Sequence, residues 1–189
     1  MSPFQKSASR YAVEYSRLLL GFEWSSVLPL VSDLERARES GAQVFLVGNG
    51  GSAANAIHWA NDLIYPLTKK GGKAIRAEAL SANQASVTCL ANDVGYERIF
   101  EHQLRSFADS DDILIALSGS GNSPNILHAL QAAKEIGMSS HAILGFDGGR
   151  AKLLAGHVVH FSVNDMQLAE DFQMMLCHII LQHLLNSAE

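Results

Sequence analysis

Short hydrophobic runs that end in glycine- or serine-rich turns recur along the chain from residue 43 onward. The expected strands are VFLVG (44–48), DILIALS (112–118), HAILGF (141–146), HVVHFSV (157–163) and the weaker KAIRAEA (73–79). Segments with helical periodicity separate them, at 52–65, 83–107 with a break, 123–137, near 149–155 and at 167–186. Strands that alternate with helices at this spacing indicate a parallel sheet joined by right-handed crossovers. The pattern predicts an α/β fold, a doubly wound parallel sheet with helices on both faces.

Residues 1–41 have a helical pattern and precede the first expected strand. Apolar side chains fall on one face of each of two segments, at Tyr11, Tyr15, Leu18, Leu19 and Phe22, and at Val27, Leu30, Val31 and Leu34. Gly41 should end the second helix, because glycine readily takes a positive φ. With 189 residues and no linker or repeat, the chain is expected to form one domain over 1–189. Residues 1–41 would be a helical extension that packs on its own sheet or on another subunit.

Composition narrows the class of protein. A hydrophobic content of 48% with 17% charged residues is typical of a globular domain. The net charge of -5 argues against nucleic acid as a partner. The two cysteines form no disulfide framework, the amino terminus lacks the apolar core of a signal peptide, and no apolar run could span a membrane. We therefore expect a cytoplasmic protein with no membrane partner.

Two turns that follow expected strands carry the candidate chemistry. GNGGS (48–52) offers a glycine backbone that a ligand can approach closely, and a helix starts near Ser52. SGSGNS (118–123) offers the hydroxyls of Ser118, Ser120 and Ser123 and the amides of another helix start. Ligands of doubly wound sheets bind beyond the carboxyl ends of the strands, so the two turns are best considered together. Their combination suits a phosphate dianion without a lysine or arginine.

Other interpretations of the glycine-rich turns fit less well. Ala53 occupies the third glycine position of GxGxxG, and no acid clearly follows about twenty residues later, which argues against a dinucleotide site. No GK[ST] follows the glycines, which argues against a P-loop. Either turn alone would be compatible with a plain strand-to-helix connection. Two such turns, the second with serines at i, i+2 and i+5, favour a phosphate site.

Four further side chains are candidates for metal binding or proton transfer. His58 and Asp62 lie four apart in the helix after the first turn and share one face, where a local histidine–aspartate pair is the alternative. Glu170 and His178 lie in an otherwise apolar helix, where a helix-start charge and a hydrogen-bonded core histidine are the alternatives. Eight residues of helix span about 12 Å, too far for Glu170 and His178 of one chain to bind one ion. If both serve one site, they come from different subunits, which predicts an interfacial active site in an oligomer.

Several longer motifs resemble a known family. GNGGSA followed by LSGSGNS is similar to the SIS (sugar isomerase) domain. More narrowly, GNGGSAANAIHWANDL, CLANDVGYERIF, ALSGSGNSPNIL and GFDGGRAKLLAGHVV resemble the sedoheptulose 7-phosphate isomerases, or phosphoheptose isomerases, over about residues 40–183. The resemblance implies a doubly wound sheet of about five parallel strands and a homotetramer. It also implies conversion of sedoheptulose 7-phosphate to D-glycero-D-manno-heptose 7-phosphate through an enediol, for bacterial surface polysaccharide.

The resemblance implies roles for individual residues as well. The family's metal or catalytic set maps onto His58, Asp62, Glu170 and His178, with Asp62 as the base and His178 as the complementary acid or base. Asp62 replaces a glutamate and Glu170 replaces a glutamine, and the set still suits one Zn²⁺ per site with a more negative charge. The expected substrate contacts are Asn49, Gly50, Gly51, Ser52, Asp93, Ser118, Gly119, Ser120, Ser123 and Glu170.

Departures from the family pattern leave alternatives open. The shorter Asp62 could impair proton transfer, since misplacing a reacting group by about 1 Å can cost roughly a hundredfold in rate. Gln167 replaces a family aspartate, which leaves substrate preference open. Asp93 could instead cap a helix or a turn. The remaining large side chains are expected in the core or an interface rather than at the ligand, namely Trp24, Trp59, Met166, Met174 and Met175.

Three functions are compatible with these observations. The leading hypothesis is a metal-assisted phosphoheptose isomerase. SIS domains also serve as non-catalytic sugar-phosphate sensors, and one similar branch binds the bacterial replication initiator as a tetramer. The four proton-active side chains argue against that branch, because a binding module does not need them. An isomerase or epimerase of a different sugar phosphate is the third hypothesis.

Overall fold

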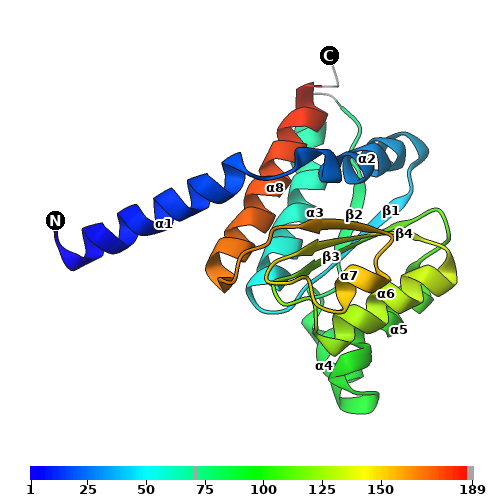
Figure 1. Ribbon diagram of the computed structural model, residues 1–189. Coiled ribbons are helices and arrows are strands. Elements are labelled where there is room, and N and C mark those ends of the chain that lie inside the picture. The colour runs from blue at the N-terminus through cyan, green and yellow to red at the C-terminus, as the bar shows by residue number, and fades with distance from the viewer. Residues whose placement is uncertain (70–71, 187–189) are drawn as a thin grey trace.

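The computed structural model describes residues 1–69 and 72–186 and contains a five-stranded sheet (Figure 1). Its strands, in the spatial order β2-β1-β3-β4-β5, are β1 (Gln43–Val47), β2 (Arg76–Ala79), β3 (Ile113–Ser118), β4 (Ser139–Leu144) and β5 (His157–His160). All neighbouring strands are parallel. The predicted doubly wound α/β fold is therefore confirmed. The order of the strands reverses at β1 and β3, which is where such sheets bind ligands.

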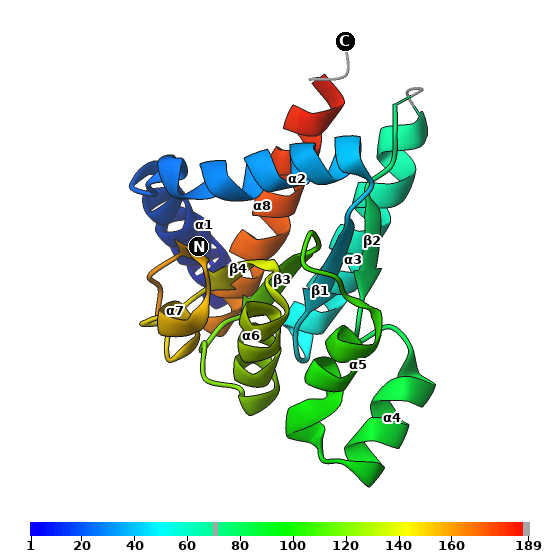
Figure 2. The same ribbon diagram turned by 90° about the vertical axis from the view of Figure 1, so that its right-hand side faces the viewer.

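Helices cover both faces of the sheet, as Figures 1 and 2 show. One face packs against α2 (Leu28–Ser40), α3 (Gly51–Lys69) and α8 (Met166–Asn186). The other packs against α5 (Ile99–Phe107), α6 (Pro124–Ile136) and α7 (Ala151–Leu154). The break expected within 83–107 is the 3-10 turn η2 (Tyr96–Arg98), which separates α5 from α4 (Gln84–Asp93). None of the helices in the described ranges combines the length and apolarity that a membrane crossing needs.

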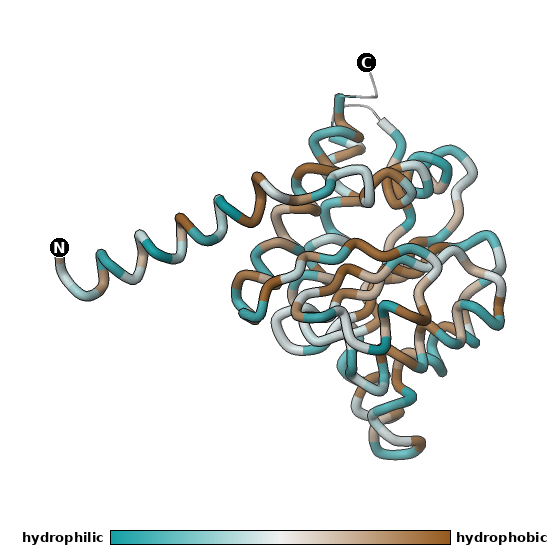
Figure 3. Tube along the Cα trace, in the orientation of Figure 1, coloured by the Kyte–Doolittle hydropathy of each residue, from teal (hydrophilic) through white to brown (hydrophobic). Residues whose placement is uncertain are grey.

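The strands are hydrophobic along their whole length because both faces are covered. In β1, Val44 and Leu46 belong to the core under α2, α3 and α8, while Phe45 and Val47 belong to the core on the opposite face. This burial on two sides removes the alternation of polar and apolar residues that a half-exposed strand would have. Figure 3 shows the hydrophobic residues gathered along the central strands.

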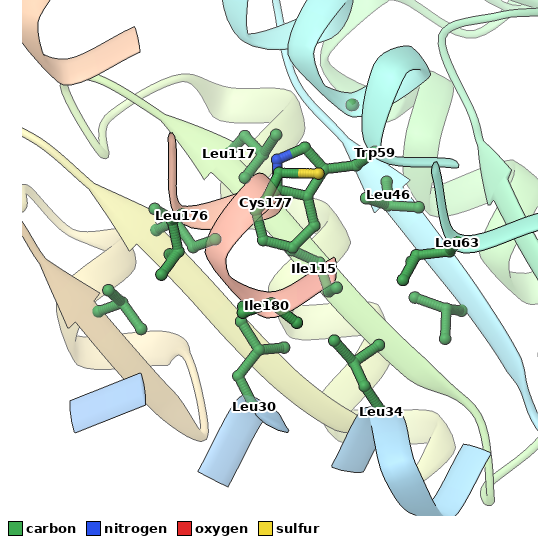
Figure 4. Close-up of a cluster of buried hydrophobic side chains, with 14 of the residues drawn as sticks. Leu30, Leu34, Leu46, Trp59, Leu63, Ile115, Leu117, Leu176, Cys177 and Ile180 are labelled. Atoms are coloured by element: carbon green, nitrogen blue, oxygen red, sulfur yellow. The ribbon is translucent and has the colours of Figure 1, made fainter. Parts of the chain in front are cut away.

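Trp59 occupies the centre of the core between the sheet and the helices α2, α3 and α8. Figure 4 shows its indole beside Cys177 of α8, with Leu30 and Leu34 of α2 nearby. Its side chain is fully buried, as the sequence predicted, and its Nε1–H donates to the carbonyl oxygen of Gln173 at 3.0 Å. A buried indole that keeps this hydrogen bond contributes apolar area without leaving an unsatisfied donor.

The two helices of the amino-terminal extension behave differently. Helix α2 follows the 3-10 turn η1 (Trp24–Val27), packs on the sheet of its own chain and ends at Gly41 with φ +85°. Helix α1 (Pro3–Leu20) has no buried residue and projects away from the body (Figure 1). Only its last turns, with Tyr15, Leu18 and Leu19, pack against the core. Most of α1 is therefore available to another surface.

A polar cluster joins α2 to the amino-terminal half of β4. The fully buried His141 contacts Asp33 through Nε2 and Oδ2 at 2.8 Å, and Ser139 also donates to Asp33. Burial alone would raise the pKa of Asp33, but the hydrogen bonds from Ser139 and His141 outweigh it and lower that pKa. Burial lowers the pKa of His141, although its bond to Asp33 opposes the shift. We infer a neutral imidazole that donates to a carboxylate.

This cluster predicts a loss of stability on acidification. A histidine with a lowered folded pKa contributes stability that is complete above its unfolded pKa of about 6.5 and is lost as the pH falls below it. Asp33 adds a further loss as the pH falls below its own unfolded value. The urea midpoint should therefore fall between pH 7 and pH 5, and it should fall less in His141→Gln, which keeps a donor but does not titrate. A midpoint that rises in the wild-type protein relative to this variant would mean that His141 is charged in the fold.

Candidate active site

The two predicted turns meet at the carboxyl ends of β1 and β3. A cavity of about 230 Å³ is lined there by Asn49, Gly50, Gly51, Ser52, Leu117, Ser118, Gly119, Ser120, Ser123, Met166 and Glu170. The two strands are neighbours, with Val47 paired to Ala116, so the loops that follow them lie at the same edge of the sheet. Apart from Asp93, every substrate contact expected from the sequence lines this cavity. Met166, expected in the core or an interface, lines it too.

The serine turn and two helix starts line the cavity with groups that favour an anion. Ser118 is buried, and its Oγ accepts from the Gly121 amide at 3.0 Å, which shapes the turn. Ser123 precedes α6 and makes no capping bond to it, so its hydroxyl is available to a ligand. Helix α3 begins at Gly51 on the opposite wall. Unpaired amides at helix starts favour negative charge, which is the requirement for binding a phosphate.

Asn49 is held in place by residues that the sequence did not indicate. Its side-chain amide exchanges two hydrogen bonds of 2.8 Å with that of Asn125, which is buried at the start of α6. The hydroxyl of Tyr96 also donates to Asn49 Oδ1, at 2.9 Å. The NSPN sequence around Asn125 carried no signal of this pairing, because the partner lies 76 residues away. These bonds join the glycine turn to the serine turn.

His58, Asp62 and His178 converge on the exposed side of α3 and α8. The Nε2 atoms of His58 and His178 are 3.1 Å apart, and Asp62 Oδ2 lies 3.2 Å from the first and 3.7 Å from the second. Both imidazoles are about half exposed, whereas the Asp62 carboxylate is 11% exposed. Asn61 donates to the other oxygen of Asp62 at 3.2 Å. One ligand atom from each of the three residues lies within 4.8 Å of the others, a spacing that suits a metal ion.

The neighbouring Cys177 does not add to this group. Burial, with a contribution from the nearby Asp62 carboxylate, raises the pKa of the Cys177 thiol. The Cys177 side chain is buried, and its sulfur is not among the ligand atoms that lie within 4.8 Å of one another. Among the residues that the structure describes, the donor set of one chain at this group is therefore two imidazole nitrogens and one carboxylate oxygen.

Glu170 lies in the cavity and not with the triad. Its carboxylate packs against Gly51, where an added Cβ would lie 2.3 Å from Oε2. The rise of α8 from Glu170 to His178 is about 12 Å, which keeps the two side chains of one chain apart. Of the four predicted metal ligands, one chain thus brings His58, Asp62 and His178 together. The carboxylate of Glu170, a residue of α8, lies instead beside Gly51 at the start of α3.

Asp93 also lies outside the cavity. It is the last residue of α4 and is exposed, and its partners are Asn92, which donates to it at 2.8 Å, and the Cys89 thiol at 3.5 Å. Gln167 is exposed as well. Asp93 is not a helix cap either, because α4 is capped by Asn83 at its start and by Val94 at its end.

A polar clamp sets the register of α3 against α8 between the cavity and the triad. The Asn55 side-chain amide donates to the carbonyl oxygen of Glu170 at 2.9 Å and to Gln173 Oε1 at 3.1 Å. Gln173 is 1% exposed, and its Nε2 has no hydrogen-bond partner within the described residues. Together with the hydrogen bond from Trp59 Nε1 to the carbonyl oxygen of Gln173, these bonds fix the position of α3 along α8.

Replacing Asn55 by alanine should lower the free energy of unfolding by about 1–3 kcal/mol, since it leaves the buried Gln173 amide without a partner. Urea unfolding followed by circular dichroism measures the change. Asn164→Ala is the control, because Asn164 is exposed and makes no side-chain hydrogen bond in the described ranges. Equal stability of the two variants would contradict the clamp.

Comparisons with known proteins agree with this fold. A family model described as the SIS domain matches residues 12–145. The phosphoheptose isomerase of Helicobacter pylori (strain P12) is 36% identical over 144 residues, which cover 75% of this chain and 73% of that protein. The phosphoheptose isomerase of Clostridium acetobutylicum is 33% identical over 182 residues, which cover 95% of this chain and 92% of that protein.

A solved structure supports the fold independently. The phosphoheptose isomerase from Neisseria gonorrhoeae matches with a TM-score of 0.87 over 96% of this chain and 98% of its own, at 24% identity. The prediction of an SIS-domain protein similar to the phosphoheptose isomerases is confirmed by the family model and the relatives. The chain therefore belongs to the SIS-domain family of sugar-phosphate isomerases, among the phosphoheptose isomerases.

Proposed function

We propose that the protein converts sedoheptulose 7-phosphate to D-glycero-D-manno-heptose 7-phosphate. The observation that carries this proposal is the convergence of His58, Asp62 and His178 two helix turns beyond a cavity lined by serines. From Gly51 to His58, α3 rises about 10 Å. That separation suits a seven-carbon sugar with its phosphate at one end and its carbonyl at the other. The name phosphoheptose isomerase, which the relatives carry, supports the same substrate class.

The serine turn is the proposed phosphate anchor. The hydroxyls of Ser118, Ser120 and Ser123 and the amides at the start of α6 would bind the phosphate, while Asn49, Ser52 and Glu170 would contact sugar hydroxyls. Gly50, Gly51 and Gly119 would allow the backbone to approach the ligand closely. Anchoring the distant phosphate turns proton transfer at the other end into a reaction between fixed partners, which lowers its entropic barrier. Asp93 would reach a sugar hydroxyl only after movement of α4 or from another subunit.

Isomerisation moves a proton between C1 and C2. We assign Asp62 as the base that takes a proton from C1 while the electron pair forms the C1–C2 double bond. His178 would protonate the C2 carbonyl oxygen, which completes the enediol. Return of a proton to C2 and loss of the proton from O1 then leave the C1 aldehyde. The 3.1 Å contact between Nε2 of His58 and Nε2 of His178 supports the role of His178 in proton transfer. At that distance the two nitrogens can hold at most one proton between them, which either ring can carry.

The triad also fits a divalent metal, with Zn²⁺ as the proposed ion. His58, Asp62 and His178 would hold it, and His178 would then serve as a ligand in place of its role as the acid, because the Nε2 atom that faces the ion could not also carry a proton. When bound, the ion would polarise the carbonyl oxygen and stabilise the charge that develops there. Glu170 would be a fourth ligand only if another subunit supplied it.

We further propose a homotetramer of single SIS domains, each spanning residues 1–189, with active sites at the subunit interfaces. Helix α1 supports this, because Phe4, Val13 and Leu20 are exposed on an arm that contacts the rest of the described chain along one side only, through residues such as Tyr11 and Tyr15. Ile57 and Ile179 are exposed beside the triad and would be covered in the same assembly. A monomer, found by light scattering, would remove the argument for an interfacial site. We place the activity in the cytoplasm, in the supply of heptose for surface polysaccharide.

The test is to incubate the purified protein with sedoheptulose 7-phosphate and to follow the aldoheptose 7-phosphate by NMR, with and without chelator and added Zn²⁺. We expect turnover that chelation abolishes and Zn²⁺ restores. Turnover that ignores the chelator would keep the isomerase and reject the metal. Binding of the sugar phosphate without turnover in any condition would reject the enzyme in favour of a sensor or a module that binds the replication initiator. Turnover of other sugar phosphates alone would point to a different isomerase.

A further inference from the structure

Phe146 has a backbone conformation that no other non-glycine residue of the described ranges adopts, with φ +45°. It lies in the loop after β4, residues 145–150, which contains three glycines. The left-handed region is unfavourable for a residue with a Cβ. Such a conformation persists only where the surrounding contacts hold it, and it is often found beside functional sites.

His160 at the end of β5 supplies one of the contacts that hold Phe146. Its Nε2 lies 3.0 Å from the Phe146 carbonyl oxygen, and its Nδ1 lies 3.2 Å from Nζ of Lys152. An ammonium group can only donate, so Nδ1 is the acceptor and the proton of a neutral imidazole is on Nε2. His160 therefore donates to Phe146. On the other side, the Phe146 amide donates to the carbonyl oxygen of Val163 at 2.9 Å.

The 145–150 loop is in turn hydrogen-bonded to the serine turn. The Gly145 amide donates to the Gly119 carbonyl oxygen at 3.0 Å, and the Arg150 amide donates to Asn122 Oδ1 at 3.0 Å. Directly after the loop, the Ala151 amide donates to the Gly121 carbonyl oxygen at 2.9 Å. The backbone of the serine turn is thus bonded to a loop whose own conformation depends on His160.

We propose that His160 is a positioning residue for the phosphate anchor. It does not line the cavity, and it acts through Phe146 and the loop to fix the serine turn in the shape that binds phosphate. A site that is already ordered does not lose further conformational entropy when the ligand binds, so its affinity is higher. The inference rests on the proposed function, because it takes the serine turn to be the phosphate site.

The experiment compares His160→Leu, which removes the donor, with His160→Gln, whose amide nitrogen can take the place of Nε2. Affinity for inorganic phosphate is measured by NMR titration, and kcat and KM are measured with sedoheptulose 7-phosphate. His160→Leu should weaken phosphate binding and raise KM by about three- to tenfold, the worth of one hydrogen bond, with kcat within about twofold. His160→Gln should restore most of the affinity. The control is His157→Leu, the same change on the same strand but outside the cavity and the loop.

The outcomes separate this inference from the proposed function. If the wild-type protein binds no phosphate, the proposed site is wrong and the inference falls with it. If the wild-type protein binds phosphate and His160→Leu binds it equally well, only the inference is overturned. A kcat that falls with KM unchanged would also overturn it. Should His160→Leu fail to fold, Lys152→Met replaces it, because Lys152 is exposed and its loss frees the His160 ring to turn; unchanged phosphate affinity in that variant would reject the proposal.

Discussion

Replacing His178 by alanine should lower kcat for sedoheptulose 7-phosphate by about a hundred- to ten-thousandfold, the usual contribution of a positioned acid–base group. The imidazole lies within hydrogen-bonding distance of His58 and close to Asp62, so its loss removes a proton carrier or, with the ion bound, a metal ligand. KM should change little, because the proposed phosphate anchor, the serine turn, is left intact. The same variant should bind Zn²⁺ more weakly in competition with a chelator, a readout that does not depend on turnover.

His183→Ala is the matched control for this variant. It makes the same change on the same helix, at a residue whose Nε2 contacts Glu35 at 3.0 Å and which lies outside the triad. It should keep the wild-type kcat. The half-exposed position of His178 predicts that its replacement leaves the melting temperature nearly unchanged, so a loss of activity would not reflect unfolding. Activity of His178→Ala within tenfold of the wild type would reject the role assigned to His178.

Gly121→Ala should disrupt the phosphate anchor more than any single serine replacement. Gly121 has φ +64°, and an added Cβ would lie 2.1 Å from the carbonyl oxygen of Gly148. That contact is with backbone, which cannot turn away as a side chain can, so the serine turn and the 145–150 loop must separate. We expect phosphate affinity to fall by at least about tenfold and the free energy of unfolding to fall by about 2–4 kcal/mol, from backbone strain and the steric clash together.

Gly41→Ala separates these two causes. Gly41 has φ +85°, and its Cβ would meet nothing within 4 Å, so the variant carries the backbone cost without the clash. It should lose about 1 kcal/mol and bind phosphate as the wild type does. Urea unfolding and NMR titration with phosphate give the two readouts. If both variants lost the same stability and neither lost affinity, close packing of Gly121 against Gly148 would not matter to the site.

Local sequence was sufficient for the fold class and for the position of the serine turn at the cavity. The runs at 44–48 and 112–118 are continuous and apolar because both faces of β1 and β3 are covered, so their pattern identified buried parallel strands. Gly41 was identified as a helix end because positive φ is a local requirement. The serines at 118, 120 and 123 surround the cavity because a strand end and a helix start follow each other directly in the chain. The run 73–79 is the least hydrophobic of the expected strands, so its ends were the hardest to predict. Only Arg76–Ala79 forms a strand.

The tertiary structure decided which distant residues meet. His58 and His178 are 120 residues apart, and their contact depends on how α3 packs on α8, which no local pattern specifies. The bond between Asn49 and Asn125, the place of Met166 in the cavity and the hold of His160 on Phe146 have the same origin. The sequence by itself determined the elements and the chemistry at their ends, because periodicity and turn preferences act over a few residues. The assembly of the triad and the support of the serine turn were decided by side-chain packing and helix register, which are properties of the folded chain as a whole.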